Sequence, residues 1–265
     1  MSERRPLEPP TVDDGPIWDI WLSTHLLPSV SAADELGLFA FLSEGPASAL
    51  RIREHLGLEQ RPTEALLAVL AAFDLLVLRE DQFHLSDLAR TYLVRGSQFY
   101  WGWMLGPYTP RTEQMIAVLR GQDGTADERV GREWEAGVMT PERALASSRS
   151  MHSHSLPAAT GMARNGDFTG VHRFLDVAGG SGCFAIALAV AHPDIHCTVA
   201  ELPAVRLQTE RYIAEFGVGG QVDTIELNMF RDAWPHGYDA IFFSNVFHDW
   251  DVPTCQTLTR RSYEA

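Results

Sequence analysis

The sequence contains no lysine. All 21 of its basic residues are arginine, and with 35 acidic residues the formal net charge is −14. Without an ε-amine, the chain cannot form a Schiff base through a side chain, anchor pyridoxal phosphate or supply the lysine of a P-loop. Nucleic-acid phosphates and anionic membranes attract basic surfaces, so the acidic balance argues against both as partners.

Cysteine and long apolar runs are also scarce. The three cysteines form no CxxC pair and fit a reducing cytoplasm better than a disulfide framework. The first 16 residues include two arginines with no apolar segment behind them, so we expect no signal peptide. The sequence contains no run of about 18 apolar residues, so we expect no membrane span. With 265 residues, 45% of them hydrophobic, the chain can form one or two domains around a buried core.

Residues 1–16 are rich in proline and predict a flexible arm, whereas residues 17–95 have the apolar spacing of a compact helical domain. The expected elements are a helix ending at Gly37, a short helix beginning at Phe39, helices over 48–57 and 61–73, and a β-hairpin over 75–78 and 82–85. This is the pattern of a winged helix, which either binds DNA or serves as a packing or dimerisation module. The segment 61–70 would read the DNA groove, yet it has one arginine, one glutamate and mostly apolar residues. The dimerisation interpretation is therefore favoured.

Residues 96–165 predict a helical bridge. The aromatic residues between Phe99 and Tyr108 are expected to be core, residues 121–131 a loop, and residues 141–165 a long helix. From residue 171 onward, strands alternate with helices, which predicts a parallel α/β sheet. The strands are expected over 172–177, 196–200, 222–227 and 238–244, and the helices over 183–191, over 203–216 and from 253 onward.

The strongest local motif joins the first of these strands to its helix and reads Asp176-Val-Ala-Gly-Gly-Ser-Gly182. A glycine-rich turn at this place brings backbone N–H groups close to a ligand. Glu201 ends the next strand, where a carboxylate can accept both hydroxyls of a ribose. Together they predict a nucleoside-containing cofactor, with an ordinary tight turn as the alternative. The glycine spacing does not fit the G-x-G-x-x-G pattern of NAD sites.

Four motifs in order resemble the S-adenosylmethionine-dependent small-molecule O-methyltransferases of the caffeic acid and hydroxyindole type. They are the glycine turn 176–182, Glu201-Leu-Pro-Ala-Val205, Asn228-Met-Phe230 and Asn245-Val-Phe-His-Asp-Trp-Asp251. The resemblance covers roughly residues 17–265. It implies a Rossmann-like class I methyltransferase sheet in residues 166–265, with strand order 3-2-1-4. It also implies a homodimer formed through residues 17–95, and substrate-pocket helices within residues 96–165. The family is found in plant phenolic and bacterial natural-product pathways, which implies transfer to a phenolic or polyketide-like hydroxyl, with S-adenosylhomocysteine as the second product.

The resemblance also assigns roles to individual residues. The residues expected to hold the cofactor are Ser155, Asp176, Gly179, Gly180, Gly182, Glu201, Asn228, Met229 and Ser244. Glu201 and Asn228 stand where the family usually has aspartate, against the ribose and near the adenine respectively. Ser244 stands where several plant members have lysine, so its contact is changed. Ser155 would touch the carboxylate end of the cofactor, and Met229 would pack on the adenine face.

His248 is expected to be the general base. A neutral imidazole can take the proton of an acceptor hydroxyl at pH 7, and because the sulfonium supplies the leaving group, no metal is required. Residues Trp103, Met151, His154 and Met162 are expected to line the acceptor pocket. A metal pair from His152 and His154 is disfavoured, because residues two apart on a helix point to different sides.

The sequence also departs from the family pattern in its number of strands: it predicts four, where the family sheet has seven. The fourth expected strand is apolar on both faces, as a buried central strand would be. The chain is then a fragment, a chain whose sheet is completed by a second polypeptide or a swapped segment, or a non-catalytic remnant, and we hypothesise one of the first two. Two other functions stay open, namely a cofactor-binding enzyme that performs decarboxylation, hydroxylation or pericyclic chemistry, and a regulatory protein.

Overall fold

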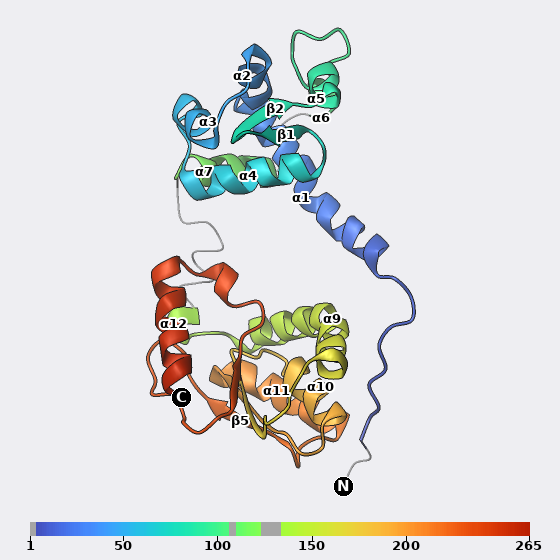
Figure 1. Ribbon diagram of the computed structural model, residues 1–265, viewed down its shortest axis with the longest axis vertical. Helices are drawn as coiled ribbons and strands as arrows, with labels where there is room; N and C mark the ends of the chain where they lie inside the picture. The colour runs from blue at the N-terminus through green and yellow to red at the C-terminus, as the bar shows by residue number, and fades with distance from the viewer. Residues whose placement is uncertain (1–3, 106–109, 123–133) are drawn as a thin grey trace. The chain divides into compact units, whose positions relative to one another are not determined.

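The computed structural model describes residues 4–105, 110–122 and 134–265 (Figure 1). The chain divides into two compact units. Unit 1 comprises Met1–Val12 and Arg129–Ala265, and unit 2 comprises Asp13–Glu128. Each unit has its own hydrophobic core, so each is described by itself.

Unit 2 is a helical domain with one small hairpin. Its elements are α1 (Gly15–Glu35), α2 (Leu38–Glu44), α3 (Ala49–Leu56), α4 (Gln60–Ala72), β1 (Leu76–Arg79), β2 (Gln82–Leu85), α5 (Asp87–Tyr92), α6 (Gly102–Leu105) and α7 (Pro110–Leu119). The strands β1 and β2 pair antiparallel, with Leu76 opposite Leu85. Gly37 adopts a left-handed φ of 80° between α1 and α2, a conformation that glycine reaches without steric cost. The expected helices and hairpin are thus present.

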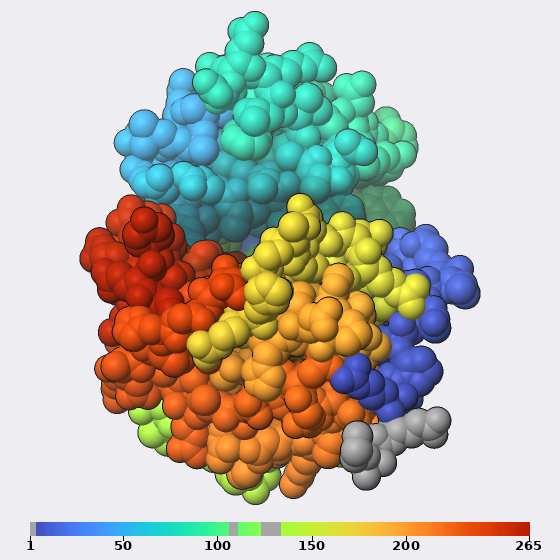
Figure 2. Space-filling model, turned by 60° about the horizontal axis from the view of Figure 1, so that its bottom comes forward, coloured from blue at the N-terminus to red at the C-terminus, as the bar shows by residue number. Residues whose placement is uncertain are grey.

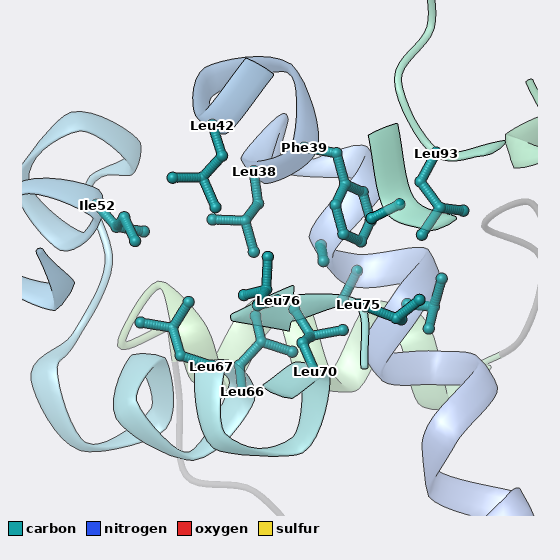
Figure 3. Close-up of a cluster of buried hydrophobic side chains, with 14 of the residues drawn as sticks. Leu38, Phe39, Leu42, Ile52, Leu66, Leu67, Leu70, Leu75, Leu76 and Leu93 are labelled. Carbon is teal, nitrogen blue, oxygen red and sulfur yellow. The ribbon is translucent and has the colours of Figure 1, made fainter. Parts of the chain in front are cut away.

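The core of unit 2 is built largely from leucine (Figure 3). Side chains from α2, α3, α4 and β1 converge there, and the largest of those that are almost fully buried are Leu38, Phe39, Leu42, Ile52, Leu67, Leu70 and Leu76. The spacing of Leu66, Leu67 and Leu70 along α4 places all three on the side of that helix that faces the core. This explains why the segment that would have read a DNA groove is apolar.

The expectation that residues 99–108 form core is wrong for most of its members. Phe99, Trp101, Trp103 and Met104 are between 54% and 81% exposed, while Tyr108 lies outside the described residues. The reason is local: α6 has only four residues, too few to present a continuous face to the core. Tyr100 is partly buried instead, and its hydroxyl donates to Asp34 Oδ2 at 2.5 Å.

The first half of α1 also differs from the continuous apolar face expected from its spacing. Full burial begins at Pro28. Of the earlier apolar side chains, Trp18 and Leu26 are partly buried, whereas five are 41–69% exposed, namely Ile17, Ile20, Trp21, Leu22 and Leu27. Among the described helices none is by itself long and apolar enough to cross a bilayer; α1 and α2 satisfy length and composition only as a pair, bent by 59°.

Unit 1 is built around a parallel sheet with the order β5-β4-β3-β6. Its strands are β3 (Arg173–Val177), β4 (His196–Glu201), β5 (Val222–Glu226) and β6 (Ala240–Phe242). Numbered within the sheet this is the order 3-2-1-4, as expected. The strand β6 is shorter than the segment 238–244 predicted for it, and it pairs with β3 at the edge of the described sheet.

Helices cover both faces of this sheet. Residues of α9 (Pro141–Asn165), α10 (Cys183–Ala191) and α11 (Pro203–Phe216) share one core with Phe174, Val199 and Phe242. On the other face, Leu175 and Val177 pack with Leu258 of α12 (Val252–Glu264). Because successive residues of a strand point to opposite faces, the apolar run in β3 is buried on both sides. A short 3₁₀ turn, η1 (Phe247–Asp249), lies between β6 and α12.

Part of the expected flexible arm (residues 1–16) makes several contacts with the rest of unit 1. Figure 2 shows this part in dark blue on the surface of the unit. The amide of Arg5 donates to Phe216 O at 3.1 Å, and its guanidinium lies 2.6 Å from Glu215 Oε1. Arg164 donates to Leu7 O at 2.7 Å. Residues 5–7 are therefore held against the ends of α9 and α11.

Candidate functional site

The glycine-rich turn follows β3 and leads directly into α10. Gly180 and Gly182 have φ values of 60° and 72°, a left-handed region that side chains with a Cβ rarely occupy. A Cβ on Gly179 would lie 2.6 Å from Asp176 Cγ and 2.8 Å from Val199 Cγ1, so only glycine fits there. At Gly180 a Cβ would meet no atom within 4 Å. The turn is thus tightly packed beneath and open above Gly180, as a ligand cradle must be.

Asp176 lies beneath this turn and is fully buried. Neither carboxylate oxygen makes a hydrogen bond of ordinary geometry with the described residues, although the amide of Ala185 lies close enough to oppose the rise in the pKa of this group. Burial, together with the nearby charge of Glu201, raises the pKa of Asp176 to about 8. A buried carboxyl group without a donor is costly, and such a group is a candidate to receive one from a ligand.

Glu201, at the end of β4, is folded back onto the turn. Its Oε1 accepts from the amide of Gly180 at 3.0 Å and its Oε2 accepts from the amide of Leu202 at 2.7 Å. The side chain is 2% exposed, and burial raises its pKa to about 7. Each carboxylate oxygen has a second lone pair, so Glu201 can still accept from a ribose if the overlying surface opens.

Two hydroxyl groups fix the turn to neighbouring helices. Thr209 of α11 is fully buried and donates to Gly180 O at 2.6 Å. Ser181 is 1% exposed, and its Oγ lies 3.0 Å from Nδ1 of His152 on α9. Sequence patterns alone do not predict these roles for His152, Ser181 or Thr209. The only sequence signal for His152 is its position three residues before Ser155, which places both on one face of the helix.

The long helix α9 carries several of the other expected site residues. Ser155 is buried, and its Oγ lies 3.1 Å from His154 Nδ1 and accepts from Asn245 Nδ2 at 3.5 Å. Met151 is 39% exposed, while Met162 is partly buried against the core beneath. The helix therefore connects Ser155 to the loop that follows β6.

Asn228 and Met229 follow β5, at the same carboxyl edge of the sheet as the glycine turn. Both amide atoms of Asn228 are engaged, since Nδ2 donates to Glu135 O at 3.0 Å and Oδ1 accepts from the amide of Phe230 at 3.0 Å. Met229 lines a cavity of about 230 Å³ together with Phe230, Leu258 and Arg261. The expected adenine contacts of these two residues stay predictions.

The loop after β6 carries the expected base. Ser244 is partly buried, and Asn245 has an unusual φ of 54°. His248 lies on η1 with a side chain that is 63% exposed, and its Nε2 is 3.1 Å from Asp249 Oδ1. The carboxyl ends of β3, β4 and β6 thereby place the glycine turn, Glu201 and the loop with His248 at one edge of the sheet. Trp103 lies on α6 of unit 2 and stays a prediction.

The residues at this edge fit a cofactor such as S-adenosylmethionine. Three observations support the fit: the open space above Gly180, the oxygens of Asp176, which have no hydrogen-bond partner within the described ranges, and the second carboxyl group at the end of β4. Once ionised, the two carboxyl groups also suit the positive charge of a sulfonium and an ammonium group.

Comparisons with known proteins agree with this arrangement. Residues 115–265 match the O-methyltransferase domain, and residues 19–95 match the O-methyltransferase dimerisation domain. The 3-hydroxy-5-methyl-1-naphthoate 3-O-methyltransferase of Streptomyces sahachiroi is 32% identical over 239 residues, which are 84% of this chain and 65% of that protein. The N,N-dimethyltransferase OxyT of Streptomyces rimosus is 30% identical, over 91% of this chain and 72% of that protein. The chain thus spans about two thirds of the length of these relatives.

A solved structure shares the fold. The O-methyltransferase family 2 protein of Planctomyces limnophilus, solved in complex with apigenin, superposes with a TM-score of 0.80 at 24% identity. The match covers 97% of this chain and 76% of that one. It confirms the expected fold class, a Rossmann-like methyltransferase sheet with an N-terminal helical domain. The matched domains and relatives together show that this chain belongs to the S-adenosylmethionine-dependent small-molecule O-methyltransferase family.

Proposed function

We propose that the protein transfers a methyl group from S-adenosylmethionine to a hydroxyl of a phenolic or polyketide-like small molecule. The observation that carries the proposal is the glycine turn 178–182, which is open above Gly180 and has the unpartnered carboxyl group of Asp176 beneath it. Family membership supplies the reaction class, and the naphthoate O-methyltransferase relative supports an aromatic acceptor.

The residues of unit 1 have separable tasks in this proposal. Gly179, Gly180 and Gly182 let the backbone approach the cofactor, and Asp176 and Glu201 offer acceptors to its polar groups. Ser155, Asn228, Met229 and Ser244 complete the cofactor site. The bound cofactor supplies an electrophilic methyl group on sulfur. Met151, His154 and Met162 would contact the acceptor.

His248 would remove the proton of the acceptor hydroxyl. Its imidazole is mostly exposed on η1, so an incoming acceptor can reach it. Asp249 lies 3.1 Å from Nε2 and can stabilise the imidazolium that forms once the proton has moved. Deprotonation matters because a neutral hydroxyl is a poor nucleophile toward a methyl group.

Transfer to nitrogen is a second candidate. The relative OxyT is an N,N-dimethyltransferase at 30% identity, so the family scaffold supports more than one acceptor atom. An amine acceptor with a neutral nitrogen needs less help from a base than a hydroxyl does. The two candidates therefore differ in how strongly turnover depends on His248.

We further propose that the protein is a homodimer that associates through unit 2. The match of residues 19–95 to a dimerisation domain supports this assembly, and the exposed apolar half of α1 offers a surface for it. The hypothesis that a further segment or chain pairs with β6 rests on the edge position of that strand alone.

The proposed function is tested first by calorimetry with S-adenosylmethionine and S-adenosylhomocysteine. We expect one site per chain, with a Kd on the order of the 1 μM to 1 mM that is typical of enzyme KM values. Incubation with S-adenosylmethionine and a panel of hydroxynaphthoates, flavonoids and matched aromatic amines should then add one methyl group to a hydroxylated member, as mass spectrometry would show. Binding without any methylated product, but with another mass change, would favour non-methyl chemistry instead.

A further inference from the structure

His152 makes a contact that the proposed function does not use. It lies on α9 and is half-buried, and its ring is stacked on Tyr212 with centroids 4.0 Å apart and an interplanar angle of 9°. Phe216 contacts the same ring at 5.8 Å, and the guanidinium of Arg5 lies 5.3 Å from the centroid of the Phe216 ring. These aromatic neighbours from α11 hold the imidazole plane in one orientation.

That orientation directs Nδ1 of His152 to Oγ of Ser181 at 3.0 Å. Ser181 belongs to the glycine turn and is 1% exposed, so the hydroxyl has no access to bulk water. Burial lowers the pKa of His152 from its ordinary value, which favours the neutral ring at pH 7. A neutral imidazole has one donor and one acceptor nitrogen, and either suits a hydroxyl partner.

The contact connects two parts of the cofactor site. Ser155 lies one turn after His152 on the same face of α9, and Ser181 is flanked by Gly180 and Gly182. A hydrogen bond between His152 and Ser181 therefore fixes the glycine turn relative to the face of α9 that carries Ser155. Thr209 fixes the same turn from α11, through its 2.6 Å bond to Gly180 O.

We infer that His152 is a positioning residue, which pre-organises the glycine turn for the cofactor through its hydrogen bond to Ser181. The inference rests on the proposed function, because the turn is taken to hold S-adenosylmethionine. A pre-organised turn does not have to be ordered at the moment of binding, so the benefit should appear in cofactor affinity. The rate of the chemical step should be nearly insensitive to it.

The first test needs no cofactor. Hydrogen–deuterium exchange of the full chain should show faster exchange of the amides of Gly180 and Gly182 in His152→Phe than in the wild type. Phenylalanine keeps a ring for the stack on Tyr212 and removes the hydrogen bond. His192→Phe is the matched control, because it loses a 2.7 Å bond from Nε2 to Ala163 O on the same helix without touching the turn. Unchanged exchange at the turn in His152→Phe would overturn the inference.

The second test measures affinity for S-adenosylhomocysteine by calorimetry. One hydrogen bond predicts an increase in Kd of about 3- to 10-fold in His152→Phe and in Ser181→Ala. The double variant should be no weaker than either single one, because both remove the same bond. His152→Asn, which keeps a polar group near the position of Nδ1 but not the ring, should recover most of the affinity.

Two results would contradict the inference, and each is separable from a failure of the proposed function. One is that the losses of affinity for S-adenosylhomocysteine add up in the double variant. The other is that His152→Phe keeps full affinity while His152→Asn loses it. Either result would show that packing of the ring, rather than the hydrogen bond, determines the affinity. If His152→Phe does not fold, Ser181→Ala tests the same bond from the other side. A wild-type chain that binds no S-adenosylhomocysteine would refute the proposed function and the cofactor half of the inference, while the exchange experiment would still decide whether His152 orders the turn.

Discussion

The carboxylate of Glu201 accepts a 3.0 Å hydrogen bond from the amide of Gly180, so the acid that ends β4 is attached to the glycine turn that follows β3. This contact joins the two strand ends that a nucleoside-containing cofactor would span. It also buries Glu201 beside Asp176, which has no partner of its own among the described residues. The pair makes the turn sensitive to pH.

Stability of unit 1 should therefore fall as the pH rises. The pKa of Asp176 is raised from 3.8 to about 8 and that of Glu201 from 4.5 to about 7, so between these limits the folded state holds protons that the unfolded state has released. The free energy of unfolding then decreases with pH, by at most about 1.4 kcal/mol per unit for each group. In Asp176→Asn, the free energy of unfolding measured with urea should depend less steeply on pH between pH 5.5 and 8.

Asp239→Asn is the matched control for this prediction. Hydrogen bonds from the amides of His172 and Arg173 lower the pKa of Asp239, so this group titrates in acid below the tested range. Its slope should equal that of the wild type. An unchanged slope in Asp176→Asn would show that Asp176 is charged in the folded protein.

Gly179→Ala should disrupt the turn. The new Cβ would lie 2.6 Å from Asp176 Cγ and 2.8 Å from Val199 Cγ1, both in the packed interior. We expect a loss of about 1–3 kcal/mol in the free energy of unfolding, together with a loss of S-adenosylhomocysteine binding in calorimetry. Gly161→Ala provides the comparison, because nothing lies within 4 Å of its Cβ and alanine favours the helix α9. Equal stability of the two variants would contradict this account of the turn.

His248→Ala should abolish hydroxyl methylation while leaving the cofactor bound. Loss of a general base lowers turnover by about 10²- to 10⁴-fold. The exposed imidazole contributes little to folding, so Kd for S-adenosylhomocysteine should change by less than about twofold. The exposed His172, before β3, offers a control in His172→Ala, which should retain turnover. Full activity of His248→Ala on a hydroxyl would exclude it as the base.

Leu70→Ala should destabilise unit 2. Leu70 is fully buried in the leucine-rich core (Figure 3), and removing its side chain leaves a cavity worth about 2–5 kcal/mol. Leu78→Ala, on the hairpin of the same unit, changes a side chain that is 54% exposed and should cost less than about 1 kcal/mol. Chemical denaturation followed by tryptophan fluorescence measures the free energy of unfolding of both variants. Equal losses in the two would contradict the placement of Leu70 in the core.

Trp21→Asp should weaken the proposed homodimer. Trp21 is 55% exposed on the apolar half of α1, and a charge there opposes burial against a second copy. Light scattering over a dilution series should show dissociation at higher protein concentration than for the wild type. Leu207→Asp, which places the same charge at a 51% exposed leucine of α11, should leave the dimer unchanged. A monomeric wild type would refute the dimer proposal itself.

Local sequence patterns were sufficient for most of the fold. Local rules of spacing and composition predict the helices α1 to α4, the break at Gly37, and the alternation of strands and helices after residue 171. The order of the sheet, and the family itself, were accessible because four motifs retain their order along the chain. Where a short-range rule was applied to a segment that forms only one short helix of four residues, as at Trp101 and Trp103, the prediction of burial was wrong.

The sequence alone determined which residues stand at the ends of strands, and hence that Asp176, the glycine turn, Glu201 and His248 belong to one edge of a parallel sheet. Only the tertiary structure decided how they are bonded. Glu201 is folded onto Gly180, Asp176 has no hydrogen-bond partner in the described part of the chain, and His152 reaches Ser181 because α9 packs beside α10 and α11. The physical reason is that strand ends are fixed by local periodicity, whereas hydrogen bonds between α9 and the turn join residues 29 positions apart and depend on how helices pack.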